Sequence, residues 1–338
     1  MRSVELVVLV RADDTFEVVG FGALNVDLIY EAPHSTITEI VRDARPGTEI
    51  TLPREEMYRV LQHFERRGHL KHKAAGGQAA NTVVALSRMG FRCGYIGCVG
   101  DDEEGKFLID ALECVDTAGV VKQGKSGVCA VILDRTGERT IVVFPNANDT
   151  VCYDRVNVAY VSGARFLYLT SFVGDEPLEA QKRLAEDVAD RCRIALDPGE
   201  LYARRGLDEL RQIIERAEIV FATESEIEVM TGMDYSRGCQ ELLAVGASII
   251  ACKRGEQGSY IVSQDVAFEV PVETVDVVDR TGAGDVYAAG FIAGLLRGAP
   301  LEHCAALASR VASRSITGYG RSCYPDPSDL ADLQVAGN

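Results

Sequence analysis

The stretch VVDRTGAGDVYAAGFIAGLLRG, residues 277–298, decides which fold this chain is expected to adopt. Its opening apolar residues predict a strand that ends at Asp279, and the glycines that follow leave the backbone N–H groups unobstructed. A helix rich in Ala and Gly begins near Asp285, so it can lie close against a sheet. The N–H groups of residues 282–285 would form a site for negative charge at the positive end of the helix dipole. A strand, a glycine loop and a helix in this order are typical of an α/β fold.

Two interpretations of Asp285 follow from this arrangement. As a capping residue, its carboxylate would stabilise the helix by about 1 kcal/mol. Beside an anion site in a crevice, the same carboxylate would take a proton from a hydroxyl while the N–H groups hold a phosphoryl group in transfer. The spacing of the residues alone leaves the two interpretations equally open.

A second glycine-rich stretch, AAGGQAANTVVALSRMG at residues 74–90, opens another helix. In one interpretation it is only a tightly packed helix start. In the other, Gly76 and Gly77 let a polar ligand touch the backbone, and the Asn81 amide donates and accepts hydrogen bonds one turn later. The stretch is therefore a candidate binding element.

Strand-like and helix-like segments alternate through most of the chain, which is typical of parallel βαβ units. The strands are nearly continuous in Val, Ile and Leu, so both faces of the sheet are expected to be covered by helices. The predicted strands are 16–23, 93–100, 165–172, 193–197, 218–223 and 247–252, and the clearest predicted helices are 176–192 and 207–217.

Two segments interrupt this alternation. Residues 128–146 contain two strand-like runs around DRTGE, so they predict an antiparallel hairpin. Within residues 31–73 a helix is expected from Pro53 to Gly68, because Pro is favoured at helix starts and Gly at helix ends. Core packing, rather than a partner site, is indicated by the apolar stripe of this helix, which comprises Met57, Val60, Leu61 and Phe64.

Composition limits the classes of function. The chain has 338 residues, 47% of them hydrophobic and 25% charged, which fits one large globular domain over residues 1–338. Its net charge of −16 disfavours nucleic acid and membrane surfaces as partners, because both carry negative charge. No apolar run reaches the roughly 18 residues of a membrane span. The ten cysteines are scattered, as in a reduced protein, so a cytoplasmic location is expected.

Two further glycine motifs match nucleotide-binding patterns without the required context. GVVKQGKS at 119–126 satisfies the P-loop pattern, but a helix precedes it and a strand follows, which is the reverse of what a P-loop needs. GFGALN at 20–25 lacks the third glycine of the dinucleotide fingerprint. It instead places Asn25 and Asp27 at the end of a central strand, where α/β folds bind ligands. A P-loop NTPase is therefore disfavoured.

With its two glycine-rich segments, GGQAANTVVALSRMG and DRTGAGDVYAAGF, the chain resembles the ribokinase-like (PfkB) carbohydrate and nucleoside kinase family. GFGALNVD is similar to the opening strand of that family, LDRTGERTIVVFPNAND to its lid hairpin, and CKRGEQGS to its nucleotide-side turn. The resemblance runs from about residue 17 to about residue 330. It implies a three-layer, Rossmann-like, mostly parallel sheet flanked by helices. A small β-lid would be formed by residues 28–50 and 114–146, and in relatives such a lid often serves as a homodimer interface.

The resemblance also implies roles for individual residues. Asp285 would be the general base, and the anion hole would comprise Gly282, Ala283 and Gly284. The sugar hydroxyls would be bound by Asn25, Asp27, Gly76, Gly77 and Asn81. ATP, the phosphate donor, would lie along Lys253, Gly255 and Gly258, with residues 309–319 beneath the adenine. Glu226 would organise Mg²⁺ indirectly, and Asp279 matches a ligand position for a monovalent cation such as K⁺.

Two features depart from the family pattern. The family motif N-x-x-E appears here as residues 223–226, so Glu226 is kept while Thr223 replaces the Asn expected at the nucleotide and metal site. The stretch between Asp27 and Gly76 is longer by about one helix, at residues 51–70. This excursion is expected to change the shape of the lid or of an oligomer, or to influence which substrate is bound.

The expected function is transfer of the γ-phosphate of ATP to a sugar hydroxyl. A nucleoside kinase on the same fold is the alternative, in which Tyr30, Phe144 and Phe172 would stack on a base unless they belong to the core. A non-catalytic sugar or nucleotide sensor is a further alternative. An intact Asp285 argues against a sensor, because a protein that only binds needs no base there.

Overall fold

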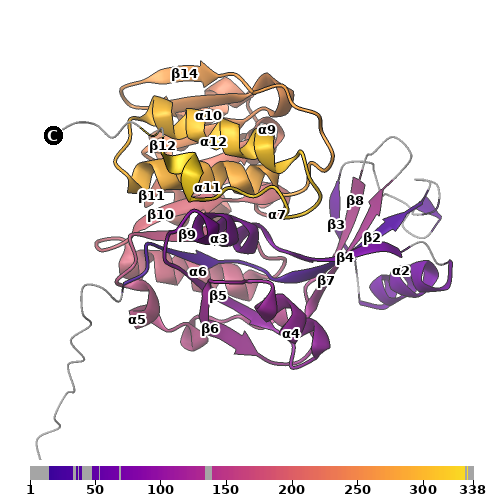
Figure 1. The fold of residues 1–338 in the computed structure, drawn as a ribbon. Coiled ribbons are helices and arrows are strands. Elements are labelled where there is room, and N and C mark those ends of the chain that lie inside the picture. Colours follow the sequence, from indigo (N-terminus) through magenta and orange to yellow (C-terminus); the bar gives the residue numbers. More distant parts are fainter. Residues whose placement is uncertain are drawn as a thin grey trace, which may run out of the picture.

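The computed structural model of the chain describes residues 15–32, 36, 38–39, 48–52, 54–67, 70–133, 139–331 and 333. These residues form two β-sheets with helices packed around them (Figure 1). The larger sheet and most of the helices make up the body of the molecule. The smaller sheet projects from one side of the body with one helix beside it (Figure 1).

The body is built on a nine-stranded sheet. Its order is β14 (Ala267–Val270), β13 (Ser259–Ser263), β12 (Ile249–Lys253), β11 (Ala217–Thr223), β10 (Arg193–Asp197), β9 (Phe166–Thr170), β1 (Val18–Phe21), β5 (Cys93–Val99) and β6 (Asp116–Lys122). The strands from β12 to β6 run parallel, and β13 and β14 are added antiparallel at one edge. The predicted, mostly parallel sheet is confirmed, and the six strands predicted at 16–23, 93–100, 165–172, 193–197, 218–223 and 247–252 correspond to β1, β5, β9, β10, β11 and β12.

Helices cover both faces of this sheet. They are α3 (Gln78–Arg88), α4 (Glu103–Asp110), α5 (Val158–Val161), α6 (Asp175–Val188), α7 (Gly199–Ala203), α8 (Leu207–Ile214), α9 (Glu224–Thr231), α10 (Tyr235–Val245), α11 (Ala283–Leu296) and α12 (Leu301–Ser315). Val18 packs into a core shared with α3, α11 and α12, whereas the next residue, Val19, packs into one shared with α6, α8 and α10. Burial on both faces explains the nearly continuous apolar strands. Within the described part of the chain, no helix combines the length and hydrophobicity needed to cross a bilayer.

The smaller sheet, which we call the lid, has five strands. Their order is β3 (Glu49–Thr51), β8 (Arg139–Phe144), β7 (Gly127–Leu133), β2 (Asn25–Glu31) and β4 (Leu70–Gly76). β7 and β8 pair antiparallel, which confirms the predicted hairpin, and its turn at residues 134–138 lies outside the described residues. β2 follows β1 directly in the chain, so the lid is connected to an interior strand of the large sheet.

The predicted excursion forms α2 (Arg54–Arg67), which packs on the lid. Met57, Val60 and Phe64 are buried there against lid side chains that include Tyr30 and Phe144. Core packing of the apolar stripe is therefore confirmed. The expected helix ends, Pro53 and Gly68, lie outside the described residues.

The lid boundaries differ from the prediction. The segment expected to begin at residue 114 contains β6, which pairs with β5 in the large sheet. β6 is an edge strand with alternating exposure, which gives it the half-buried pattern of a lid strand. The lid also includes β4, which pairs with β2 and had not been assigned to it. In the other predicted lid segment, 28–50, residues 33–35, 37 and 40–47 lie outside the described residues. A single domain carrying an inserted lid stays a prediction.

The strand predicted to end at Asp279 is not formed, because residues 271–282 are neither helix nor strand. Val277 and Val278 are 46% and 44% exposed. The N–H groups of Val278 and Asp279 donate to the carbonyl of Ile316, which follows α12, and not to a strand. The apolar run therefore lacks a sheet neighbour, which a sequence pattern alone does not reveal. The short 3₁₀ helices within the described residues are η2 (Asn146–Thr150), η3 (Tyr153–Arg155), η4 (Gly255–Gln257) and η5 (Pro327–Leu330).

Candidate active site

The body and the lid enclose a cleft of about 660 Å³. Alternate residues of the lid strands line it, such as Ile29 and Val143, while their neighbours pack against α2. Most of the predicted site residues line this cleft: Asn25, Asp27, Gly77, Asn81, Thr223, Glu226, Lys253, Gly282, Ala283, Gly284 and Asp285. Four described residues predicted for the site lie outside its lining: Gly76, Gly255, Gly258 and Asp279.

Asp285 is the third residue of α11 and is 7% exposed. Gly282 takes the N-cap position with φ of 78°, so Asp285 is not the N-cap of this helix. A Cβ at Gly282 would also lie 3.0 Å from the Tyr324 hydroxyl, so both the backbone and the space call for glycine. Asp285 Oδ2 accepts a hydrogen bond from Asn81 Nδ2 at 2.8 Å. The geometry therefore favours a role for this carboxylate in the cleft over the capping role.

A buried charge cluster lies beside the first turn of α11. Lys253 Nζ donates to Asp197 Oδ2 at 2.6 Å, and Asp197 is fully buried. Burial is the largest single influence on the pKa of the Lys253 ammonium and acts to lower it, but the nearby carboxylates, Asp197 and Glu226 foremost, together outweigh burial, so the net shift is upward and the group stays charged. A Cβ at Gly284 would lie 3.3 Å from Lys253 Nζ, so the ammonium lies directly against the helix terminus. First-turn N–H groups have no partner within their helix. The N–H of Ala283 donates to the carbonyl of Arg280 at 3.3 Å, and the next N–H groups of the first turn, together with the ammonium, form a site suited to phosphate.

The lid also contributes polar groups to the cleft lining. Asn25 is 9% exposed, and its Oδ1 accepts from Asn148 Nδ2 at 2.9 Å. Asn148 is held in turn by the backbone N–H and carbonyl of Leu24, both at 2.9 Å. Asp27 lies next to Cys129 in the β2–β7 pair, and after burial its charge is the main cause that raises the pKa of that thiol. Asn25 and Asp27 are thus held on β2 and line the cleft.

Glu226 and Thr223 form the N-terminal cap of α9. Thr223 Oγ1 accepts from the N–H of Glu226 at 3.2 Å, and Glu226 Oε2 accepts from the N–H of Thr223 at 2.7 Å. This capping box gives Thr223 a structural role in the position where the family has Asn. Burial raises the pKa of Glu226, and the Lys253 charge opposes that rise. Their predicted contacts with nucleotide and metal stay predictions.

Three predicted residues outside the cleft lining have evident structural contacts. Gly255 begins the η4 turn that joins β12 to β13 and Gly258 follows that turn, and a Cβ at Gly258 would overlap the carbonyl of Val270. Asp279 accepts from the N–H groups of Thr281 at 2.9 Å and Gly320 at 3.1 Å. Asp279 thereby ties the loop before α11 to the C-terminal segment. Their predicted roles with nucleotide and cation stay predictions.

Sequence reasoning missed several residues of the site. Asp197 ends β10, and a carboxylate at the carboxyl end of a parallel strand is a signal that could have identified it. Glu200 accepts from the backbone N–H of Glu49 in the lid at 3.0 Å, which joins lid and body across the cleft. Asn148 carries no comparable signal, because its contacts with Leu24 and Asn25 span more than 120 residues of chain.

Comparisons with known proteins show what this chain is similar to. The family model described as pfkB family carbohydrate kinase matches residues 62–327. A protein named "Uncharacterized sugar kinase" from Archaeoglobus fulgidus is 37% identical over 243 residues, which cover 70% of this chain and 96% of that protein. Fructosamine kinase FrlD from Bacillus subtilis is 26% identical over 272 residues, 76% of this chain and 89% of that protein. The crystal structure of adenosine kinase from Sinorhizobium meliloti superposes with a TM-score of 0.83 at 24% identity, covering 94% and 98% of the two chains, and this likeness concerns the fold.

Proposed function

Because this chain belongs to the pfkB family of carbohydrate kinases, we propose that it transfers the γ-phosphate of ATP to a hydroxyl group of a sugar. One observation carries the proposal. The buried Asp285 carboxylate, at the N-terminus of α11, lines the same cleft as Asn25 and Asp27 of the lid. An acceptor held by the lid would therefore face a base and an anion site together.

The chemistry assigned to the site follows from these positions. Asn25 and Asp27 orient the sugar, and Asp285 accepts the proton of the reacting hydroxyl. The oxygen of that hydroxyl attacks the γ-phosphorus, and ADP leaves. The first-turn N–H groups of α11, together with the Lys253 ammonium, stabilise the negative charge on the phosphoryl group in transfer. The lid excludes water from the cleft, which limits transfer of the phosphoryl group to water.

The residues present fit ATP with Mg²⁺. Lys253 and the N-terminus of α11 are donors suited to phosphate, and Glu226 lines the cleft beside them. Among the described residues, no group of three or more His, Cys, Asp and Glu side chains is arranged to hold a metal by itself. That arrangement suits Mg²⁺, which binds proteins through one or two carboxylates together with substrate phosphates and water. When bound, Mg²⁺ would neutralise charge on the phosphates, and Glu226 would hold it through water.

A monovalent cation is a further part of the proposal. The Asp279 carboxylate accepts from Thr281 and Gly320, so it connects the loop before α11 to the C-terminal segment. K⁺ bound near Asp279 would act on the anion site through this loop. Activity that rises when K⁺ replaces Na⁺ at constant ionic strength would support the assignment.

The geometry favours a sugar over a nucleoside. Tyr30, Phe144 and Phe172, the aromatic residues considered for stacking on a base, are 2%, 4% and 1% exposed. Tyr30 and Phe144 belong to the lid core. Phe172 lines the cleft but is packed into the core of the body, which leaves little of its ring open to a base. The described lid residues that line the cleft include the aliphatic Ile29, Val131 and Val143. An aliphatic wall with polar groups at one end suits the rim of a sugar ring better than the face of a base.

A substrate screen tests the proposed function. Purified protein would be mixed with ATP and Mg²⁺, with and without K⁺, and offered pentoses, hexoses, their phosphates and nucleosides while ADP formation is measured. We expect turnover with an unphosphorylated sugar and slow ATP hydrolysis without an acceptor. Turnover with nucleosides alone would replace the proposal by the nucleoside kinase alternative, and binding without turnover would favour a sensor.

Gly76 gives a prediction for the sugar end of the cleft. It lies opposite Asn25 in the β2–β4 pair, and a Cβ there would overlap the Asp27 carboxylate. Gly76→Ala should therefore displace Asp27 and raise KM for the sugar roughly tenfold, the effect of losing about 1.4 kcal/mol of binding. In an Asp27→Ala background the same change should alter KM by less than about twofold, because no carboxylate is left to displace. An equal rise in both backgrounds would show that Gly76 acts in another way.

A homodimer formed through the lid is also proposed. Leu70 on the edge strand β4 is 51% exposed and Tyr58 on α2 is 43% exposed, so apolar side chains are available at that end of the molecule. Sedimentation of the purified protein would measure its mass, and Leu70→Lys should shift the dimer towards the monomer. A monomer in both proteins would refute this part.

A further inference from the structure

We propose that Arg321 is a positioning residue for the base: it fixes the Asn81 amide so that its N–H group faces the Asp285 carboxylate. The inference rests on the proposed function, because it assumes that Asp285 is the base. Arg321 lies on the C-terminal segment that follows α12 and does not line the cleft. Arg321 therefore reaches the base through Asn81 rather than by direct contact with the reacting atoms.

The contacts form a chain of three side chains. Arg321 donates to Asn81 Oδ1 twice, from Nε at 3.2 Å and from Nη2 at 3.0 Å. Asn81 Nδ2 then donates to Asp285 Oδ2 at 2.8 Å. Asn81 is 9% exposed and Asp285 is 7% exposed, so water competes little for these groups. In such surroundings a misplaced hydrogen bond costs more than it would at the surface.

The chemistry of the two ends leaves one orientation for the amide. A guanidinium can only donate hydrogen bonds, so the Asn81 carbonyl must face Arg321. An ionised carboxylate can only accept them, so the Asn81 NH₂ group must face Asp285. Without Arg321 the amide could turn over, and its oxygen would then meet the carboxylate, lone pair against lone pair. Arg321 thus holds the amide in the orientation that keeps the base aimed into the cleft.

The same contacts refine the role predicted for Asn81. Both guanidinium donors occupy its carbonyl oxygen, which has two lone pairs. One of its two amide hydrogens is directed to Asp285. Asn81 is therefore left with a single N–H for a sugar and would donate to a hydroxyl oxygen rather than accept from it. That Asn81 binds the sugar stays a prediction, and it is now restricted to the donation of one N–H group to a sugar oxygen.

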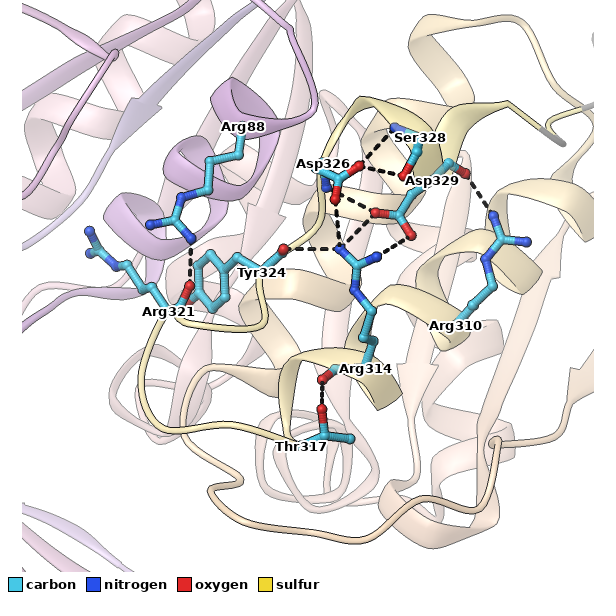
Figure 2. Close-up of polar contacts among 9 residues, drawn as sticks. All are labelled: Arg88, Arg310, Arg314, Thr317, Arg321, Tyr324, Asp326, Ser328 and Asp329. Carbon is cyan, nitrogen blue, oxygen red and sulfur yellow. Dashed lines mark hydrogen bonds and ion pairs between the residues drawn. The ribbon is translucent and has the colours of Figure 1, made fainter.

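Arg321 is itself held from several sides. Its Nη1 donates to the carbonyl of Ala111 at 2.5 Å, at the C-terminus of α4, where the helix dipole favours a cation. Its own carbonyl accepts from Arg88 of α3 at 2.5 Å, and the Arg88 guanidinium lies over the Tyr324 ring (Figure 2). Arg88 also makes two hydrogen bonds to Glu113, at 2.9 and 2.6 Å. The guanidinium of Arg321 is thus anchored independently of Asn81, as a positioning group must be.

The test replaces Arg321 and follows kcat and KM separately, with the sugar found in the screen. Arg321→Met should lower kcat by about 10²-fold, which is the effect of misplacing a catalytic group by about 1 Å, while KM for ATP stays within about twofold. Arg321→Lys keeps the charge but cannot direct two N–H groups to one oxygen, so its kcat should lie between those of Arg321→Met and the unaltered enzyme. Each kcat is divided by the fraction of folded protein, which circular dichroism measures at the assay temperature.

A control variant separates positioning from a loosened segment. Asp329 accepts from Arg314 and from the N–H of Asp326, and so anchors the same C-terminal segment away from Asn81 (Figure 2). Asp329→Ala should lower the melting temperature but leave kcat within about twofold of the unaltered enzyme, because the Arg321–Asn81–Asp285 contacts remain. A loss of kcat in Asp329→Ala equal to that in Arg321→Met would mean that Arg321 only holds the segment in place, and would overturn the proposal.

A second background distinguishes this inference from the proposed function. In Asp285→Asn, Arg321→Met should cause no further loss of kcat, because the group it positions is already disabled. If Asp285→Asn alone keeps its activity, the proposed base is wrong. If Asp285→Asn is inactive while Arg321→Met turns over normally, the base stands and the role of Arg321 is refuted. An additive loss in the double variant would also refute it.

Discussion

Asp285→Asn is expected to lower kcat by about 10²–10⁴-fold, the usual share of general-base catalysis, with little change in KM for the sugar. Asn has nearly the same shape as Asp and still offers an oxygen to Asn81 Nδ2, which lies 2.8 Å from the present carboxylate. Its amide oxygen does not take up a proton at neutral pH, so the hydroxyl loses its base. The sugar contacts at Asn25 and Asp27 come from the lid and are unchanged. Steady-state ADP formation with the identified sugar measures both constants.

A matched variant controls for the loss of one negative charge near this loop. Asp276 is exposed and lies on the segment that leads to α11, away from the cleft lining. Asp276→Asn should keep kcat within about twofold of the unaltered enzyme, as is usual for an exposed position without special contacts. Near-normal turnover by Asp285→Asn would rule out a base at this position. A comparable loss in both variants would point to a general effect of charge on phosphate binding.

Much of the fold could be predicted because its signals are local. β1, β5, β9, β10, β11 and β12 were all visible as apolar runs, since a strand buried on both faces leaves an unbroken pattern. The pattern fails where burial depends on distant neighbours. Val277 and Val278 have strand-like composition but no sheet partner, and β6 joins the large sheet although its alternation suits the lid.

The candidate site was predictable as a set of residues but not as a set of contacts. The glycine-rich motifs identified Asp285 and Asn81, yet their hydrogen bond spans 204 positions of sequence. Arg321, 240 positions from Asn81, belongs to no motif and was missed. Lys253 was expected at the nucleotide, while its buried partner Asp197 was not considered. Such long-range pairs depend on the order of the strands in the sheet. A single sequence does not reveal that order.

Lys253→Met is expected to have the largest effect on stability. The substitution leaves Asp197, which is fully buried, without the ammonium that now lies 2.6 Å away. Removing one partner of a buried ion pair typically costs about 3–5 kcal/mol, so the free energy of unfolding should fall by that amount at neutral pH. Urea unfolding followed by circular dichroism measures it. Lys253→Met combined with Asp197→Asn should recover part of the loss, because the second change removes one of the unpaired charges.

The loss should depend on pH in a direction set by Glu226. Burial already raises the pKa of this carboxyl above its ordinary value of 4.5, and Lys253 opposes the rise, so Lys253→Met should raise the pKa further. A carboxyl whose pKa is raised in the folded state contributes stability that is complete below 4.5 and is lost as pH rises through the folded value. The deficit of the variant should therefore be largest at neutral pH and shrink as pH falls towards 4.5. A deficit that is the same at every pH would show that lost packing of the lysine stem, rather than unpaired carboxylates, destabilises the variant.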